Sequence, residues 1–380
     1  MASSKLAYLY EIDGANGKNS GVSKKVRFQC GAFERAGMDC ELICLPNMSS
    51  GSPARKFLKR LPLFPDWIEW PSLSDLEGFD AFYVRKPNYI SHQFVRFLKG
   101  LRRDHPEAPI VMEVPTYPYE RELMHPQSVT LLLKDLHNRK ALRGVIDRIA
   151  DIYGHESIFG IPTISITNGV DFDALRPRAP HAQGADDPIV LVCAACFSPW
   201  HGIDRLIAGL AAYRDGSSGP RRKVRLELLG DGPSVPALKS QVEQLGLGDV
   251  VTFHGQCDQA QMDEVFDRST LGVDCLGNHR KGLVVSSSLK SREYLAKGLP
   301  FVYAGRIDVL ERWPADFALQ LPECEDPIDV DAVIRFCDRI YGGSSVVEVT
   351  RRIRSYGISH VGIDAALSEA TDYIQSRLGP

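Results

Sequence analysis

The chain has 380 residues, of which 44% are hydrophobic and 24% are charged, and its formal net charge at pH 7 is -3. This composition excludes disordered and fibrous chains, and the length predicts two domains rather than a single core. A pI near 6.4 gives no support to nucleic-acid binding, and no apolar run reaches the roughly 18 residues that a membrane-spanning helix needs.

The start of the chain and its cysteines indicate a cytoplasmic protein. Residues 1–5 lead directly into a strand-like segment, without the charged start, apolar run and cleavage site of a secretory signal. Nine cysteines without framework spacing predict reduced thiols. Cys193 and Cys196 have the spacing of a redox motif, but they lie in an apolar run that is typical of a buried strand. We therefore expect neither redox nor metal chemistry there.

Strand-like and helix-like segments alternate through the first half of the chain. The pattern predicts strands at 5–12, 40–45, 81–84 and 110–114, and helices at 22–36, 91–103 and 129–149. Such alternation is typical of a parallel sheet wrapped by helices.

The alternation restarts near the middle of the chain. It predicts strands at 189–196, 223–229, 250–254, 270–275 and 301–303, with helices at 202–213, 234–245 and 363–378. Asn168 and Gly169 lie between the two halves, and Pro177 follows them. This dipeptide predicts a tight turn with a positive φ, and hence a hinge between two domains; an ordinary hairpin turn would use the same residues.

The segment from Ile166 to Phe172, followed by Pro177, resembles the "PNGVD...F.P" linker of family-4 glycosyltransferases. The resemblance implies the GT-B fold, an α/β architecture in which two Rossmann-like domains face each other across a cleft and the C-terminal helix crosses back to the first domain. It places residues 1–168 and the returning helix 363–380 in an acceptor-side domain, and residues 169–362 in a nucleotide-sugar-binding domain. It also implies transfer of the sugar with retention at the anomeric carbon.

Ligands of open α/β sheets bind beyond the carboxyl ends of the strands, so the loops there hold the candidate site residues. The first loop carries Gly14, Asn16 and Gly21 and matches neither GxGxxG nor a Walker motif. It resembles the family's glycine-rich loop, which implies that Gly14 and Asn16 lie on the acceptor side and that Gly21, just before a helix, approaches the donor diphosphate. A plain connecting loop is the alternative.

A second group follows the strand at 189–196 and contains Ser198, Trp200 and His201. Family members have an Arg and a Lys here that neutralise the diphosphate; this chain has Ala195 and His201 in their places. His201 can still donate to a phosphate at the start of the next helix, and a capping or stacking role is the alternative. We also expect Gly230, in the turn after the strand at 223–229, on the donor side.

A third group contains Arg280, Lys281, Lys290 and Glu293. Residues 293–300 resemble the "EAMA.G.P" segment of the family, which makes Glu293 the second acid of its E-x7-E signature and a ligand of the ribose hydroxyls. The first acid, which contacts the donor sugar, is replaced by Val285. We expect Arg280 and Lys281 to stabilise the leaving diphosphate and Lys290 to help bind it; exposed, solvated cations are the alternative.

In the first domain, polar residues follow two strands. Where many family members have a His-containing loop facing the donor sugar, this chain has Glu113, which we expect to be catalytic. Arg85, Tyr117 and Tyr119 are expected on the acceptor side. Structural loops are the alternative for both segments.

The sequence therefore predicts a glycosyltransferase with a nucleotide-diphosphate sugar donor and a glycan or polyprenyl-linked oligosaccharide acceptor. Neither a cofactor nor a metal is expected, because the DxD-like residues 171–173 lie in the linker and no HExxH pattern is present. A nucleotide-sugar 2-epimerase of the same fold and a non-catalytic nucleotide-sugar-binding subunit remain alternatives. The basic and aromatic stretch 55–70 predicts a peripheral contact with anionic membrane, with solvated helix faces as the alternative.

Overall fold

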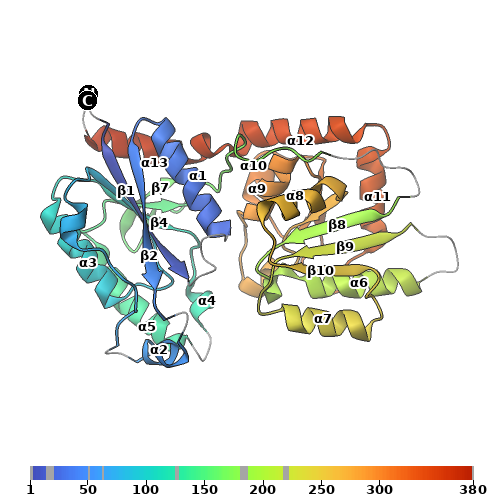
Figure 1. The fold of residues 1–380 in the computed structure, drawn as a ribbon, viewed down its shortest axis with the longest axis horizontal. Coiled ribbons are helices and arrows are strands. Elements are labelled where there is room, and N and C mark those ends of the chain that lie inside the picture. Colours follow the sequence, from blue (N-terminus) through green and yellow to red (C-terminus); the bar gives the residue numbers. More distant parts are fainter. Residues whose placement is uncertain are drawn as a thin grey trace. The chain divides into compact units, whose positions relative to one another are not determined.

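The computed structural model describes residues 3–13, 21–49, 52–61, 64–124, 128–179, 187–216 and 222–378. The chain forms two compact units. Unit 1 consists of Met1–Gly169 together with Ile363–Pro380, and unit 2 consists of Val170–Gly362. Each unit contains one β-sheet with helices packed against it (Figure 1).

Unit 1 has a seven-stranded sheet with the order β2-β1-β3-β4-β5-β7-β6. Its strands are β1 (Lys5–Asp13), β2 (Asp39–Asn47), β3 (Ala81–Arg85), β4 (Ile110–Val114), β5 (Arg148–Asp151), β6 (Ser157–Ile158) and β7 (Ile161–Ser165). All neighbouring strands are parallel except β6 and β7, which are antiparallel. The expected strands of the first half are thus confirmed, and β5, β6 and β7 are additional.

Both faces of this sheet are covered by helices, which explains why its strands are almost continuously apolar. In β1, Leu6 and Tyr8 belong to the core on one face, with α1 (Gly21–Arg35) and α13 (Ile363–Leu378). The intervening Ala7 and Leu9 belong to the core on the other face, with α3 (His92–Asp104). The alternation places successive side chains of one strand in two separate cores.

The remaining helical segments of unit 1 are α2 (Pro53–Leu58), η2 (Leu73–Leu76), α4 (Glu120–Leu123), α5 (Val129–Asn138) and η3 (Arg139–Leu142). The expected helix at 129–149 is therefore wrong in its second half. After η3 the chain turns at Gly144, which has a φ of 75°, and Ile149 and Ala150 are fully buried in β5. A short apolar strand and the end of a helix have similar patterns, and Gly144 is the residue that separates them here.

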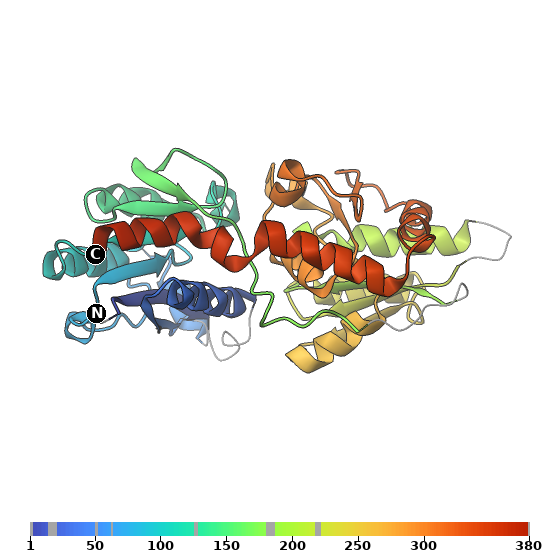
Figure 2. The same ribbon diagram turned by 90° about the horizontal axis from the view of Figure 1, so that it is seen from above.

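Helix α13 returns to unit 1 after the whole of unit 2 and lies beside α1 and β7, as Figure 2 shows. The structure places it close to Gly169: a Cβ at this position would lie 2.7 Å from the Ala366 Cβ and from the Ile363 Cα. Neither Asn168 nor Gly169 has a positive φ, so this part of the expectation is wrong. Glycine is required here by the close approach of the helix rather than by the backbone conformation.

Unit 2 has a six-stranded parallel sheet with the order β10-β9-β8-β11-β12-β13. The strands are β8 (Ile189–Ala194), β9 (Val224–Leu229), β10 (Val251–Gly255), β11 (Leu271–Val273), β12 (Phe301–Ala304) and β13 (Ala318–Leu321). The helices are η4 (Pro199–His201), α6 (Ile203–Asp215), α7 (Val235–Gln244), α8 (Gln259–Arg268), η5 (Asn278–Lys281), α9 (Leu289–Lys297), α10 (Asp308–Arg312), α11 (Val330–Tyr341) and α12 (Val346–Val361). None of the described helices has the length and hydropathy needed to cross a membrane.

Candidate functional site

The strand order of unit 2 reverses between β8 and β11. From β8 the chain continues outward to β9 and β10, then returns to β11 on the other side of β8 and continues to β12 and β13. In parallel α/β sheets such a switch point opens a crevice beyond the carboxyl ends of the two strands, where ligands bind. The loops that follow β8 and β11 hold most of the donor-side residues expected from the sequence.

Backbone hydrogen bonds join these two loops. The Leu276 N–H donates to the His201 carbonyl at 3.0 Å, and the Gly277 N–H donates to the Trp200 carbonyl at 3.2 Å. Gly202 lies at the contact with a φ of 65°, and a Cβ there would come within 2.7 Å of the Leu276 carbonyl carbon. Both the left-handed backbone and the close approach require glycine. The two loops therefore form one rigid surface.

His201 is buried in this surface, and its ring accepts a hydrogen bond from the backbone. The Ser198 backbone N–H donates to its Nδ1 at 2.9 Å. Burial, followed by the positive charge of Lys290, lowers the pKa of His201 to about 2. Because Nδ1 accepts a hydrogen bond, the single proton of the neutral ring lies on Nε2. An Nε2–H group suits an anionic oxygen, so the expected contact with phosphate is chemically consistent.

Lys290, in the second position of α9, supplies a positive charge whose side chain is 13% exposed. Its Nζ lies 3.2 Å from the Cys275 Sγ and 3.5 Å from Asp274 Oδ1. Burial opposes its charged form, but the contacts with Cys275 and Asp274 raise the pKa of Lys290 above its usual value. Asp274 is 1% exposed, and its Oδ2 has no hydrogen-bond partner among the described residues. The ammonium therefore stays charged beside His201.

Lys281 and Trp200 contact each other across the two loops. The Lys281 Nζ lies 4.0 Å from the centroid of the Trp200 ring, which is the geometry of a cation–π pair. Lys281 also contributes to the lowered pKa of His201, after burial and Lys290. The structure thus brings together Ser198, Trp200, His201, Lys281 and Lys290.

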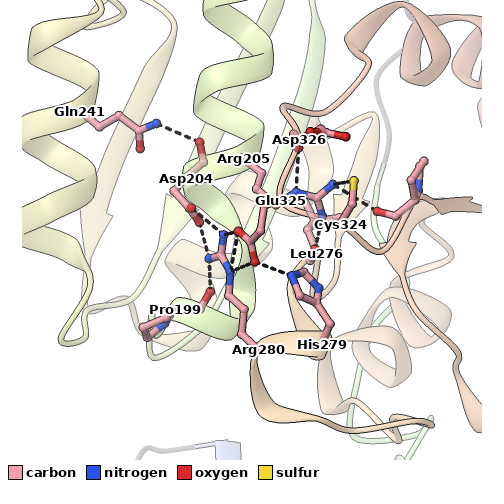
Figure 3. Close-up of polar contacts among 11 residues, drawn as sticks. Pro199, Asp204, Arg205, Gln241, Leu276, His279, Arg280, Cys324, Glu325 and Asp326 are labelled. Atoms are coloured by element: carbon pink, nitrogen blue, oxygen red, sulfur yellow. Dashed lines mark hydrogen bonds and ion pairs between the residues drawn. The ribbon is translucent and has the colours of Figure 1, made fainter.

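Arg280 has a different environment from the one expected of a catalytic cation (Figure 3). Its two terminal nitrogens each donate to Asp204 at 2.8 Å, and it also pairs with Glu325 and donates to the Pro199 carbonyl at 2.6 Å. Its hydrogen bonds, first with Asp204 and then with Glu325, raise the pKa of Arg280. We call this set of contacts the Arg280 clamp. All of the guanidinium nitrogens are used within it, which favours a structural role for Arg280.

Two further donor-side residues have contrasting positions. Gly230 follows β9 with a φ of 116°, and a Cβ there would lie 2.1 Å from the Ala195 carbonyl oxygen. The packing of the loop after β8 is therefore sufficient to explain this glycine. Glu293 is half-buried in the middle of α9. Its position one helical turn after Lys290 puts the two side chains on the same side of the helix.

In unit 1, Glu113 is fully buried in β4 and lies at the centre of a polar cluster. It accepts hydrogen bonds from Lys25 Nζ at 2.7 Å, Gln29 Nε2 at 3.0 Å and the Tyr83 hydroxyl at 3.2 Å, and it pairs with Arg85. Burial by itself raises the pKa of Glu113, but the charges of Lys25 and Arg85 outweigh it and hold this pKa at about 2. A carboxylate satisfied from all sides favours a structural role over the catalytic one expected.

The acceptor-side residues are distributed over two loops of unit 1. Arg85 ends β3 and is directed to Glu113. Tyr119 is buried and donates to Asp135 Oδ1 at 2.7 Å, so it braces the loop. Tyr117 remains partly exposed. Gly14 and Asn16 lie outside the described residues, and Gly21 is the first residue of α1.

The stretch 55–70 is only partly available at the surface. Trp70 stacks on Phe94 and Phe97, with ring centroids 5.4 and 5.0 Å away, and packs against the core. Phe57 is 60% exposed and Phe64 is 38% exposed. Phe57 and Phe64 are therefore exposed as the membrane hypothesis requires, whereas Trp70 is packed against the core.

Sequence reasoning missed the acidic residues that organise this region. Asp204 follows the second group by three residues, and Glu325 lies in a distant loop after β13, without a local pattern that would mark it. Asp274 follows directly after the short strand β11. Its position at a strand end was the one sequence signal that could have marked it as a site residue. Among the described residues, no group of three or more His, Cys, Asp or Glu side chains is arranged to hold a metal ion.

Residues 176–285 match the family model described as glycosyl transferases group 1. The matched segment runs from the linker through the loop after β8 and most of the loop after β11, and it supports a glycosyltransferase. No curated protein sequence matches the chain.

Several solved structures are similar over the full length. Sucrose-phosphate synthase from Thermosynechococcus elongatus has a TM-score of 0.64 and 16% identity, with 97% of this chain and 98% of that chain covered. A glycosyltransferase from Rickettsia africae has a TM-score of 0.63 and 12% identity, with coverages of 100% and 99%. Anabaena HepE in complex with UDP has a TM-score of 0.60 and 12% identity, with coverages of 98% and 100%. At these identities the likeness shows the fold, which is the predicted GT-B fold.

Proposed function

We propose that the protein transfers a hexose with retention from a nucleoside-diphosphate sugar to a glycan or a lipid-linked oligosaccharide. One observation carries the proposal. The switch point of unit 2 combines a neutral histidine, His201, whose Nε2–H donates, with the ammonium groups of Lys290 and Lys281. A hydrogen-bond donor surrounded by fixed positive charge is suited to a diphosphate, and the family match over residues 176–285 includes His201 and Lys281.

In this proposal, Lys290 takes over the role of the absent Arg and Lys of the family pattern. The diphosphate lies over the start of α6, where it accepts from His201 Nε2 and is neutralised by Lys290 and Lys281. Glu293, on the same helix as Lys290, holds the ribose hydroxyls as the resemblance implies. These cations supply the charge stabilisation of the leaving group, and the proposed reaction needs no metal. Ser198 fixes the His201 tautomer, and Trp200 holds Lys281 in place.

UDP is the first nucleotide to test, because Anabaena HepE is described in complexes with UDP and with UDP-glucose. The experiment is a thermal-shift screen of the purified full chain with UDP, GDP, ADP, CMP and TDP. A ligand that binds the folded state raises the melting temperature by mass action. We expect one diphosphate to stabilise the wild-type protein and Glu293→Ala to abolish that shift.

Lys290→Met tests the carrying observation directly. It should weaken nucleotide binding by roughly tenfold or more, since it removes a charge-assisted contact. Lys290→Met alone leaves the Asp274 carboxylate without its cation. The double variant Asp274→Asn/Lys290→Met removes both charges and controls for this effect. Lys239→Met, on α7 of the same unit, is the matched control and should bind like the wild type. A wild-type protein that no nucleotide stabilises, or a Lys290→Met variant that binds normally, would contradict the proposal.

Turnover separates the proposed transferase from its alternatives. Release of the nucleoside diphosphate that depends on an added glycan or lipid-linked acceptor supports transfer. Conversion of the donor sugar without an acceptor would indicate an epimerase, and binding without turnover would indicate a non-catalytic subunit. The anomeric configuration of the product, read by NMR, tests retention.

We also propose that unit 1 contacts the cytoplasmic face of an anionic membrane. The support is an exposed apolar group beside basic residues: Phe57 on α2 and Leu133 on α5 are 60% and 61% exposed. Lys134 Nζ donates to the Lys59 carbonyl at 2.8 Å, which holds α5 beside α2. Aromatic and leucine side chains flanked by lysine and arginine suit an anionic interface.

Flotation with phosphatidylglycerol vesicles tests the membrane contact. Phe57→Ser combined with Leu133→Ser should abolish binding of the full chain, whereas Val347→Ser, at an equally exposed position of α12 in unit 2, should not. Equal binding of all three proteins would refute the contact.

A further inference from the structure

A histidine and an aspartate form a pair at the carboxyl end of β5 in unit 1. Asp151 is the last residue of β5 and is fully buried. His155 follows four residues later, and its Nδ1 lies 2.9 Å from Asp151 Oδ2. The His155 backbone N–H donates to the same oxygen at 2.8 Å. The pair lies at the edge of the parallel sheet where ligands bind in this class of fold.

The carboxylate determines which nitrogen of His155 carries the proton. An ionised carboxylate only accepts hydrogen bonds, so Nδ1–H donates to Asp151 and the neutral ring keeps its lone pair on Nε2. The His155 side chain is 35% exposed, and no residue in the described part of the chain bonds its Nε2. His155 therefore offers a hydrogen-bond acceptor to solvent, the opposite of the donor that His201 offers.

The ring is not needed to hold the loop. The His155 backbone N–H already closes the loop onto Asp151, and the His155 carbonyl accepts from the Thr163 hydroxyl. Asp151 Oδ1 is also buried without a hydrogen-bond partner among the described residues. An unsatisfied buried carboxylate oxygen is costly, and such groups in native proteins call for an explanation beyond packing. Asp151 Oδ2 meets both the backbone N–H and the Nδ1 of His155, so this buried carboxylate fixes the direction of the exposed imidazole.

Aromatic rings surround the pair. Tyr117, expected on the acceptor side from the sequence, meets the His155 ring edge to face with centroids 5.0 Å apart. The Tyr153 ring is also near, with its centroid 6.4 Å from that of His155. Partly exposed aromatic rings bind the apolar face of a ligand, and an imidazole lone pair accepts from a hydroxyl. The Asp151 charge behind the ring disfavours phosphate and other anions.

We propose that His155, oriented by Asp151, forms with Tyr117 a subsite of unit 1 that binds a neutral sugar unit of the acceptor. A sugar hydroxyl donates to His155 Nε2, and the sugar ring lies against the aromatic side chains. Asp151 is a positioning residue, because it acts through His155. The assignment of the sugar to an acceptor rests on the proposed function, whereas binding of a neutral sugar does not.

Two NMR measurements on the full chain test the subsite. Long-range proton–nitrogen spectra of histidine-labelled protein, with His155→Gln to assign the signal, should show a protonated Nδ1 and an unprotonated Nε2. Asp151→Asn should move the proton toward Nε2 while the circular dichroism spectrum stays native. This first measurement tests the orientation of the ring by Asp151, whereas the ligand binding that follows tests the subsite itself.

Saturation-transfer NMR measures binding of the methyl glycosides of glucose, galactose, mannose and N-acetylglucosamine. We expect at least one to bind, with a dissociation constant of about 1–10 mM. His155→Gln and Tyr117→Ala should each weaken it by roughly fivefold, the effect of losing one hydrogen bond or contact. His254→Gln, which disrupts another histidine–carboxylate pair, that of His254 Nε2 with Glu227 in unit 2, is the control and should bind normally.

The outcomes separate this subsite from the donor site. Failure of all four glycosides to bind, or equal binding by His155→Gln and the wild type, would overturn the subsite. The nucleotide screen on the same protein is the second readout. Glycoside binding without nucleotide binding would leave the subsite standing and refute the transferase, and the reverse result would refute the subsite alone.

Discussion

Each unit buries charged side chains near the carboxyl end of its sheet, and the two groups are built in opposite ways. In unit 1, Glu113 is an anion that Lys25, Gln29, Tyr83 and Arg85 satisfy completely. In unit 2, His201 is neutral beside Lys281 and Lys290. Among the described residues, Asp274 is the only carboxylate in direct contact with Lys290, and one of its oxygens has no hydrogen-bond partner. The group in unit 1 is satisfied within the protein, whereas the group in unit 2 combines two ammonium groups with one carboxylate and leaves one carboxylate oxygen without a hydrogen-bond partner in the described part of the chain.

The comparison shows that burial of charge is by itself no evidence of a binding site. Both groups contain a residue with a strongly shifted pKa, and both lie near the ends of strands. What distinguishes them is whether the hydrogen-bonding capacity is used within the protein. Unit 1 should therefore lose stability when its group is altered, whereas unit 2 should lose ligand binding.

Glu113→Gln should produce the largest change in stability. It leaves Lys25 and Arg85 buried without their anion, which costs about 3–5 kcal/mol for a broken buried pair. Urea denaturation followed by circular dichroism measures the loss. Asp104→Asn, at an exposed pair with Arg103, is the control and should have no measurable effect. If Glu113→Gln were as stable as the wild type but inactive, Glu113 would be catalytic and the comparison would fail.

Acidification should destabilise the two units in different pH ranges. The pKa of His201 is lowered from 6.5 to about 2 and that of Glu113 from 4.5 to about 2, so in both cases the unfolded state binds more protons. Stability therefore falls as the pH decreases. The loss due to His201 begins near pH 6.5, and the loss due to Glu113 begins only near pH 4.5. Each group contributes about 1.4 kcal/mol per pH unit, hence about 2 kcal/mol for His201 at pH 5.

Denaturation curves at pH 7.5, 6 and 5 measure this dependence. His201→Gln should flatten the curve between pH 6.5 and 5, whereas His92→Gln, at an exposed position of α3, should not. A pH dependence that is identical in wild type and His201→Gln would show that His201 is not held neutral.

Arg280→Lys sharpens the distinction within unit 2. An ammonium cannot reproduce the bidentate hydrogen bond to Asp204 together with the bonds to Glu325 and the Pro199 carbonyl. We therefore expect a loss of about 1–2 kcal/mol in stability. Because the clamp uses every nitrogen, nucleotide affinity should change much less than in Lys290→Met. A larger loss of affinity than of stability would restore Arg280 as a ligand of the diphosphate.

Lys281→Gln should have the smallest effect on stability. It removes the cation–π contact with Trp200, worth about 0.5–1 kcal/mol at a partly exposed site. Nucleotide binding should weaken, and binding by the wild type should depend on salt more strongly than binding by the variant. Equal salt dependence of the two proteins would argue against a phosphate contact.

Much of the fold was predictable because its strands are buried on both faces. The apolar runs at 110–114 and 189–194 stand out without any helical periodicity, and the alternation of strands and helices indicates parallel sheets. Residues 129–149 were misjudged, since α5, η3 and the short β5 share one apolar pattern and only Gly144 separates them. Strands as short as β6 offer too few residues for any pattern.

The candidate site was predictable in position but not in detail. Ser198, Trp200, His201 and Lys281 were found because the ends of parallel strands meet at one edge. The roles of Arg280 and Glu113 depend on partners from distant segments, such as Glu325 for the first and Lys25 for the second, and no local pattern encodes such contacts. His155 and Asp151 escaped notice because the helix predicted at 129–149 overlaps the first half of β5, so no strand end was expected at Asp151.

The return of α13 to unit 1 has a consequence for how the protein is made. Arg35 of α1 pairs with Asp364 of α13, 329 residues later, and the Ser165 N–H donates to Glu369, 204 residues later. The segments of unit 2 are contiguous and are all synthesised before α13 emerges from the ribosome. During translation, the apolar residues of unit 1 that α13 covers therefore stay exposed until the end of the chain is made. Unit 1, which contains the first half of the chain, is the last to finish folding.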